Sequence, residues 1–229
     1  MKTILLGEIL NSNTSLRKSL GPFIEVLYDV QKNIPFNLRH HFYNNLSTLK
    51  IELNLDKTKP LKNFGCLGVY DCYYNKVILD PTFIKKNLKK SEIDLKLFED
   101  YIRLCLYHEF MHMASAKKEH EICYSGFSKY PVNLGDHYSR ALTEGYTEYL
   151  AYSNYHIYNH FYYIDMKIAN MFMCILGNDL LAYSYYNILG TTLLENELKK
   201  ICPNEDTDKL FETINLRYSE KYNEENVYF

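Results

Sequence analysis

The sequence contains no tryptophan, few glycines and prolines, and no long uninterrupted apolar run. A membrane-spanning helix needs about 18 or more consecutive apolar residues, so no transmembrane segment is expected. An excess of charge of one sign is also lacking, because the formal net charge is −2 at pH 7. The sequence therefore gives no reason to expect a nucleic acid or a membrane as a partner.

Disulfide and secretion signals are absent as well. The six cysteines form no Cys-x-x-Cys pair, and Cys105 falls within a predicted buried helix. The apolar run at the N-terminus is interrupted by Glu8 before it reaches the length of a signal peptide. We therefore expect reduced thiols in a cytoplasmic protein. The content of 47% hydrophobic and 24% charged residues is typical of a globular protein, and the sequence contains nothing that fixes an oligomeric state.

The first third of the chain predicts short helices followed by a small sheet. Apolar and polar residues alternate from Leu49 to Leu55, which is the period of a half-buried strand. Asp56 to Asn63 is polar and contains a proline, so it predicts a loop. We expect helices at 22–32 and 36–46, and strands at 49–55, 65–73 and 76–79. The strands should form a mostly antiparallel sheet, and its edge could either pair with an extended peptide or be an ordinary hairpin.

One long helix is predicted from Ser91 to Lys117. Ser91 and Asp94 have the spacing of a capping box, and apolar residues then recur at steps of three and four, with no Gly or Pro. This helix carries His108-Glu109-Phe-Met-His112 on its inner face. Side chains four residues apart share a helical face, so the two imidazoles can converge on one metal ion.

The glutamate of this pattern, Glu109, has a role of its own. Glu109 follows the first histidine directly and projects beside the metal, where it can take a proton from water. Burying two histidines and a glutamate together without a metal would cost several kcal/mol. The pattern therefore predicts a metal site, for which zinc with a third protein ligand is the usual occupant.

The chain after this helix predicts a loop and then mostly helices. Lys118 to Asp136 is polar and contains glycine, so we expect a loop there. A second helix begins near His137 or Ser139 and runs to about Tyr152. Further helices are expected at 161–176, 179–189, 192–201 and 207–222.

Several residues could be the third ligand. The longer metzincin pattern needs Gly and His three and six residues after His112, but Ser115 and Lys118 stand there, which excludes that class. His120 and His137 remain as alternatives outside regular apolar helices.

Glu144 is the preferred third ligand. It lies 32 residues after His112 on the second amphipathic helix, behind a loop long enough to fold back. Gly145 lowers helix propensity by about 1 kcal/mol, which we interpret as allowing this helix to approach the His108 helix closely at the metal. Glu148 shares the face of Glu144 and is predicted to accept the outer N–H of a ligating imidazole.

The two segments together resemble the gluzincin clan of zinc metallopeptidases. The resemblance covers about 45 residues and is carried by His108-Glu-Phe-Met-His112 and by Leu142-Thr-Glu144-Gly-Tyr-Thr-Glu148-Tyr-Leu150. It implies a zincin-like α+β fold, with a small sheet before the motif helix and a mostly helical C-terminal half. It also implies one Zn²⁺ per chain, bound by His108, His112 and Glu144, with Glu109 as the general base. A downstream Tyr or His would stabilise the oxyanion, for which Tyr183, Tyr185 and Tyr186 are candidates.

The predicted function is zinc-dependent hydrolysis of peptide bonds in a peptide or protein substrate. Two alternatives stay open: a regulatory protease that acts on one protein such as a repressor, and a non-catalytic domain stabilised by zinc. An intact Glu109 speaks against the latter, because a structural zinc site needs no base. We expect one domain over 1–229, made of N-terminal helices and sheet (1–90), the metal-site helices (91–160) and a helical C-terminal part (161–229).

Overall fold

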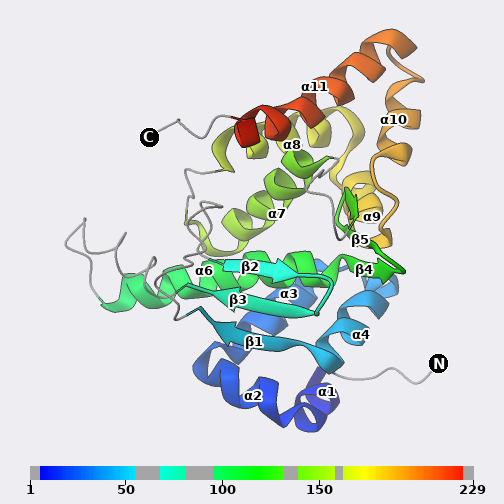
Figure 1. Cartoon of the computed structure of the whole chain (residues 1–229). Helices are drawn as coiled ribbons and strands as arrows, with labels where there is room; N and C mark the ends of the chain where they lie inside the picture. The colour runs from blue at the N-terminus through cyan, green and yellow to red at the C-terminus, as the bar shows by residue number, and fades with distance from the viewer. Residues whose placement is uncertain (1–5, 55–67, 81–94, 132–138, 158–161, 224–229) are drawn as a thin grey trace. The chain divides into compact units, whose positions relative to one another are not determined.

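The fold is α+β, and most of its regular structure is helical (Figure 1). The structure is a computed structural model that describes residues 6–54, 68–80, 95–131, 139–157 and 162–223. Contacts between Cα atoms divide the chain into two compact units, Met1–Ala114 with Ala151–Phe161, and Ser115–Leu150 with Tyr162–Phe229. No helix in these described ranges is long and apolar enough to cross a membrane. The prediction of one domain over the whole chain stays a prediction.

The first unit begins with short helices. These are α1 (Leu6–Ser12), α2 (Thr14–Leu20), the 3-10 helix η1 (Gly21–Ile24), α3 (Glu25–Asn33), the 3-10 helix η2 (Phe36–Leu38) and α4 (His40–Thr48). The helices predicted at 22–32 and 36–46 are confirmed, apart from shifts of a few residues at their ends. Helices α1 and α2 were not predicted, because seven residues show too little periodicity. Asn13 caps α2 by accepting a hydrogen bond from the Leu16 N–H at 3.0 Å.

Three short strands follow: β1 (Lys50–Leu53), β2 (Gly68–Asp71) and β3 (Lys76–Leu79). Their order is β1-β3-β2, with β2 antiparallel and β1 parallel to β3. The sheet is therefore mixed, which corrects the prediction that it is mostly antiparallel. The alternation of residues cannot reveal this, since it fixes the faces of a strand but not its direction. The predicted loop at 56–63 and the capping box at Ser91 lie outside the described residues.

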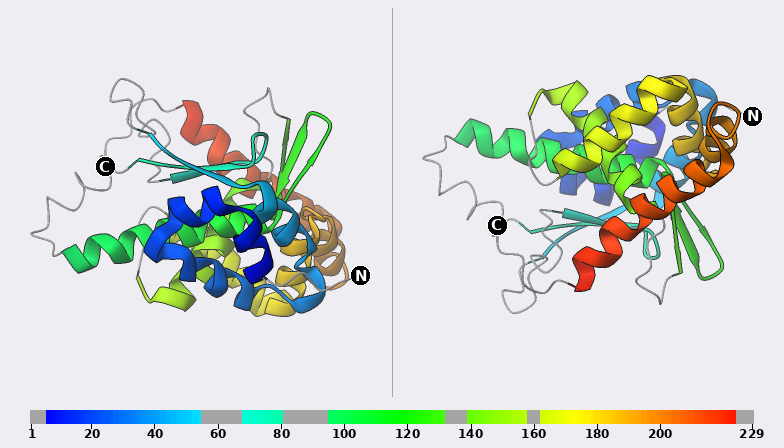
Figure 2. Two further views of the ribbon diagram at one scale, coloured as in Figure 1. Left: turned by 90° about the horizontal axis from the view of Figure 1, so that it is seen from below. Right: turned by 90° about the horizontal axis from the view of Figure 1, so that it is seen from above.

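Helix α6 (Leu95–Ala114) confirms the predicted motif helix over these residues, but it ends three residues before the predicted Lys117, because a strand already begins at Ala116. It lies along α3, α4 and β2 (Figures 1 and 2). Except for the partly exposed His112, its residues from Leu104 to Ala114 are buried. A helix that is covered on all sides is a core element and not a surface helix with one inner face.

The second unit contains a hairpin sheet and the remaining helices. Its elements are β4 (Ala116–Glu119), β5 (Ile122–Ser125), β6 (Ser128–Pro131), α7 (Arg140–Tyr155), α8 (Tyr163–Leu176), α9 (Asn178–Asn187), α10 (Thr192–Leu198) and α11 (Asn204–Asn223). The last residues of α7, from Ala151 onward, group with the first unit. All five helices predicted after residue 136 are confirmed, with ends that differ by up to three residues.

The loop predicted at 118–136 is wrong over most of its described part, 118–131, while residues 132–136 lie outside the described residues. Strands β4, β5 and β6 pair antiparallel in sequence order. Their buried positions include Cys123, Ser125 and Ser128, while Lys117 and Lys118 are exposed. Buried serines give no apolar alternation, so the strand signal is missing from the sequence. Two of the buried strand residues are serines, and one of them, Ser128, shares a hydrogen bond with Thr143 Oγ1 at 2.8 Å.

Gly145 permits a close contact inside the second unit. A Cβ atom on this residue would lie 1.9 Å from the carbonyl oxygen of Asp165 and 2.3 Å from its carbonyl carbon. The close approach that Gly145 permits is therefore between α7 and α8 inside the second unit, and the predicted approach to the His108 helix stays a prediction. Sequence alone shows that a glycine is tolerated there, but the partner follows from the packing.

This contact makes Gly145→Ala a strongly destabilising change. The Cβ would meet backbone atoms that have no other rotamer, so α7 and α8 must separate, at a cost of about 3 kcal/mol or more. Gly7→Ala is the matched control, because a Cβ on Gly7 in helix α1 meets nothing within 4 Å. That variant should gain about 0.5–1 kcal/mol. Urea unfolding of both variants measures the difference, and an unchanged midpoint for Gly145→Ala would contradict the packing described.

Candidate metal centre

Helix α3 fixes the rotation of the motif helix α6. Arg103 and Tyr107, four residues apart on α6, both face α3. Arg103 forms an ion pair with Glu25, and the buried hydroxyl of Tyr107 accepts a hydrogen bond from Asn33 Nδ2 at 2.6 Å. Successive residues of a helix differ by about 100° in direction. Holding Tyr107 therefore also sets the direction of the next residue, His108.

A second aromatic residue supports Tyr107 from the end of α7. The ring of Tyr155 meets that of Tyr107 edge to face, with 5.3 Å between the centroids. Its hydroxyl donates a hydrogen bond to Asp29 Oδ2 at 3.1 Å. Burial, followed by the Asp29 carboxylate, raises the pKa of Tyr155 well above its ordinary value. The hydroxyl is thus protonated, and a donor, throughout the physiological range.

The C-terminal end of α6 is held by α4. The carbonyl of Met113 is one of the helix-end carbonyls that lack a partner inside the helix. It accepts a hydrogen bond from Asn45 Nδ2 at 2.8 Å. This bond anchors the turn that carries His112.

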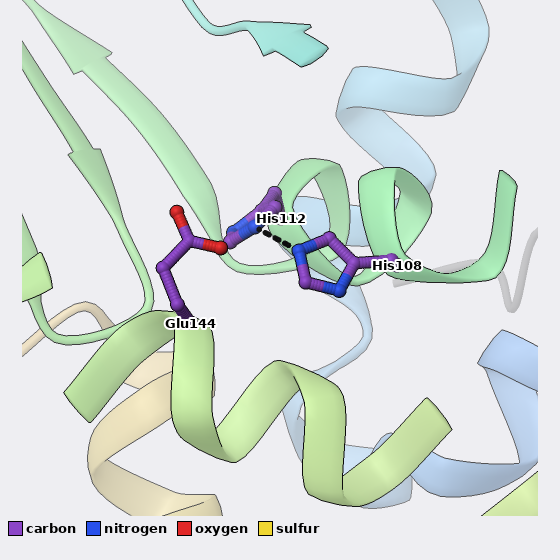
Figure 3. A group of neighbouring side chains, drawn as sticks. All are labelled: His108, His112 and Glu144. Atoms are coloured by element: carbon purple, nitrogen blue, oxygen red, sulfur yellow. Dashed lines mark hydrogen bonds between the residues drawn. The ribbon is translucent and has the colours of Figure 1, made fainter. Parts of the chain in front are cut away.

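The two histidines of the motif aim their Nε2 atoms at one place. The distance between His108 Nε2 and His112 Nε2 is 3.1 Å, and the ring planes are 71° apart (Figure 3). Two nitrogen ligands at about 2.0–2.1 Å from a tetrahedral zinc would be separated by about 3.3 Å. The geometry of the imidazole pair therefore fits one shared ion.

Glu109 lies against strand β2. The residue is only 7% exposed. A Cβ built on Gly68 would be 3.1 Å from Glu109 Cγ and 3.4 Å from Glu109 Oε1, so this carboxylate lies close to the backbone of the strand. The base predicted from the sequence is thus buried beside the sheet, on the same helix as the two histidines.

Helix α7 is fixed inside the second unit by contacts on several sides. Thr143 Oγ1 accepts a hydrogen bond from the N–H of Phe127 at 3.1 Å, and Thr147 Oγ1 shares one with the hydroxyl of Tyr185 at 2.7 Å. Gly145 lies against the Asp165 carbonyl of α8. These contacts fix the rotation of α7 about its own axis, and this rotation sets the direction of the Glu144 side chain.

At the N-terminal end of α7, one contact holds the start of the helix and a second one reaches the Glu144 carboxylate. Asn215 Oδ1 of α11 accepts a hydrogen bond from the Ser139 N–H at 2.7 Å, just before the helix begins. One turn later, Arg140 Nε lies 3.4 Å from Glu144 Oε1, and both side chains are largely buried. The guanidinium places a positive charge beside this carboxylate and engages one of its oxygens.

Together, His108, His112 and Glu144 form a group that could hold a metal ion. Each offers one ligand atom, and these atoms lie within 4.8 Å of one another (Figure 3). Two imidazoles and a carboxylate are donors that zinc accepts readily, and three protein ligands leave a position for water. The donor set therefore fits zinc. All three residues were identified from the sequence.

The other ligand candidates have different positions. His120 is exposed in the turn between β4 and β5 and does not belong to the group, while His137 lies outside the described residues. Glu148 is only 2% exposed, so it is not a solvated helix charge. Its predicted bond to a ligating imidazole stays a prediction.

The tyrosine candidates lie on α9 within the second unit. Tyr183 is 46% exposed, whereas Tyr185 and Tyr186 are fully buried. The Tyr185 ring lies on Gly126, where a Cβ would be 2.4 Å from Cε2, and its hydroxyl is engaged with Thr147. The structure gives Tyr185 a packing role, and the oxyanion role of these tyrosines stays a prediction.

Compared with known protein families, curated protein sequences and solved structures, the chain has no significant match. The support for the candidate metal centre is therefore its own geometry. Sequence reasoning overlooked two neighbours of the site, Arg140 and Gly68. Arg140 had a usable signal, since it stands four residues before Glu144 on a predicted helix. Gly68 had none, because its contact with Glu109 joins segments 41 residues apart.

We expect the purified protein to bind about one zinc ion per chain. Elemental analysis after preparation with added zinc measures the stoichiometry directly. The double variant His108→Ala/His112→Ala is the control and should bind none, because it loses the imidazole pair. A wild-type value near zero, with no uptake on titration, would contradict the assigned centre.

Glu144 and Glu148 should differ in what their removal does. Glu144→Ala leaves two imidazoles, so zinc affinity should collapse and the stabilisation by zinc should disappear. Glu148→Ala keeps the ligand set and should lower zinc affinity or activity about 10–100-fold, the range found when a hydrogen bond to a ligating imidazole is lost. Competition with a chelator ranks the two variants. Normal zinc binding by Glu144→Ala would mean that another residue is the third ligand.

Proposed function

We propose that this protein is a zinc-dependent peptidase. The observation that carries the proposal is the convergence of His108, His112 and Glu144 into one donor group. Glu109, a buried carboxylate on the same helix, supplies the group that a purely structural zinc site does not need. A three-donor group is typical of catalytic zinc sites, whereas structural sites usually have four protein ligands.

The reaction assigns a separate task to each side chain. When bound, zinc would acidify a water molecule and polarise the carbonyl of the scissile bond. His108 and His112 offer neutral Nε2 lone pairs, and Glu144 offers the only negative charge in the donor group. Glu109 accepts a proton as water attacks the carbonyl carbon, and then passes it to the leaving amine as the C–N bond breaks.

Strand β2 is the proposed place of the substrate backbone. It stands at the end of the strand order β1-β3-β2, so no other described strand pairs with its outer edge. Its first residue, Gly68, lies against Glu109. An extended peptide that joined this edge through main-chain hydrogen bonds would pass beside the base. This arrangement favours an extended peptide over the ordinary hairpin that the sequence left open.

We also propose a zincin-like fold of the gluzincin type. The support is the order of the elements: a small sheet, the helix α6 with both histidines and the base, and then α7 with Glu144. The hairpin sheet β4–β6 stands between the two helices in sequence.

Glu109→Gln should retain zinc and stability but lose turnover. The amide nearly preserves the shape of the side chain and cannot accept the proton, so kcat should fall about 10²–10⁴-fold. Glu99→Gln on the same helix is the matched control, because Glu99 is exposed and should leave kcat unchanged. Cleavage of a peptide library by wild type and both variants, with the zinc content measured in parallel, provides the test.

The result separates the peptidase from a domain that uses zinc only for stability. If wild type cleaves no peptide while it binds zinc, the peptidase proposal fails. If Glu109→Gln cleaves as fast as wild type, the peptidase stands but Glu109 is not its base.

A further inference from the structure

Gly68 is placed where a side chain would enter the space of the base. A Cβ built on it would lie 3.0 Å from Leu79 Cδ2, 3.1 Å from Glu109 Cγ and 3.4 Å from Glu109 Oε1. Carbon–carbon contacts of 3.0–3.1 Å are well inside the optimum of about 3.5–4.0 Å. Both neighbours are buried, with Leu79 at 6% and Glu109 at 7% exposure. Each therefore has little room to give way.

The backbone of Gly68 gives no independent reason for a glycine. It is not among the glycines with a left-handed φ, which are Gly21, Gly126, Gly177 and Gly190. It also stands in a regular antiparallel register, paired with Leu79. An alanine could adopt this backbone, and glycine in a strand is normally unfavourable because it packs nothing. The space beside Leu79 and Glu109 is what sets Gly68 apart.

We propose that Gly68 is a positioning residue for Glu109, because the missing side chain leaves the room in which the carboxylate stands over strand β2. Any Cβ at this place displaces Glu109 Cγ and with it the carboxylate. The kinetic consequence rests on the proposed peptidase function, whereas the steric coupling does not. A base must stand within hydrogen-bond reach of its proton, and a displacement of about 1 Å can cost about 10²-fold in rate. A Cβ at 3.1 Å calls for a shift of Glu109 Cγ of a few tenths of an ångström, so a smaller loss is expected.

A double-mutant cycle tests the coupling without any reaction. Gly68→Ala, Glu109→Ala and the double variant are unfolded thermally as zinc-free proteins, with Gly7→Ala as the control for the general effect of replacing glycine. Gly68→Ala should lower Tm by about 5 °C where Glu109 is present. In the Glu109→Ala background the shift should be at least halved, and the remainder reflects the contact with Leu79.

Kinetics then test the consequence for the base. Gly68→Ala should lower kcat several-fold, up to about 10-fold, with KM and zinc affinity close to the wild-type values, while Gly7→Ala should change none of these quantities. Equal Tm shifts in the two backgrounds would overturn the proposal, as would an unchanged kcat in an active enzyme.

Two further outcomes are also decisive. If Gly68→Ala does not fold but the double variant with Glu109→Ala does, the coupling is confirmed. If neither folds, Leu79 is the residue that needs the space and the proposal is overturned. A wild type without peptidase activity removes the proposed function but leaves the Tm cycle as a valid test of the coupling.

Discussion

The rotation of helix α6 about its own axis is the constraint on which the candidate centre depends. His108, Glu109 and His112 stand on one helix, so a single rotation turns all three side chains together. Side chains of α3 hold that rotation through Arg103 and Tyr107. A turn of α6 would leave the buried Tyr107 hydroxyl without its partner, at about 1–3 kcal/mol, and would also break the more exposed ion pair of Arg103 with Glu25. The position of the imidazole pair follows from these contacts.

In the second unit, contacts of helix α7 likewise fix the direction of one carboxylate, that of Glu144. Thr143 and Thr147 bind neighbouring elements, Gly145 lies against α8, and Arg140 stands beside Glu144. The Arg140 guanidinium places a positive charge beside one oxygen of this buried carboxylate. The contacts around Glu144 thus set its direction and give it an oppositely charged neighbour.

The sequence predicted most helices correctly because their signals are local. The period of α6, and the glycine or proline that ends or follows several later helices, lie within a few residues of the element itself. The hairpin sheet β4–β6 was missed, because its buried positions are filled by Cys123, Ser125 and Ser128 and not by a row of apolar residues. The parallel pairing of β1 with β3 was missed as well, since strand direction depends on where the chain returns between them.

For the candidate metal centre, the sequence by itself determined the chemistry of the possible donors. The spacing of His108 and His112 places two imidazoles on one face wherever the helix lies, because helical geometry is local. What only the tertiary structure decided is which residues stand beside them. It showed that Gly145 makes room for α8, that Arg140 reaches Glu144, and that Gly68 makes room for Glu109. The physical reason is that such close approaches depend on how separate elements pack, and packing leaves no periodic trace in the sequence.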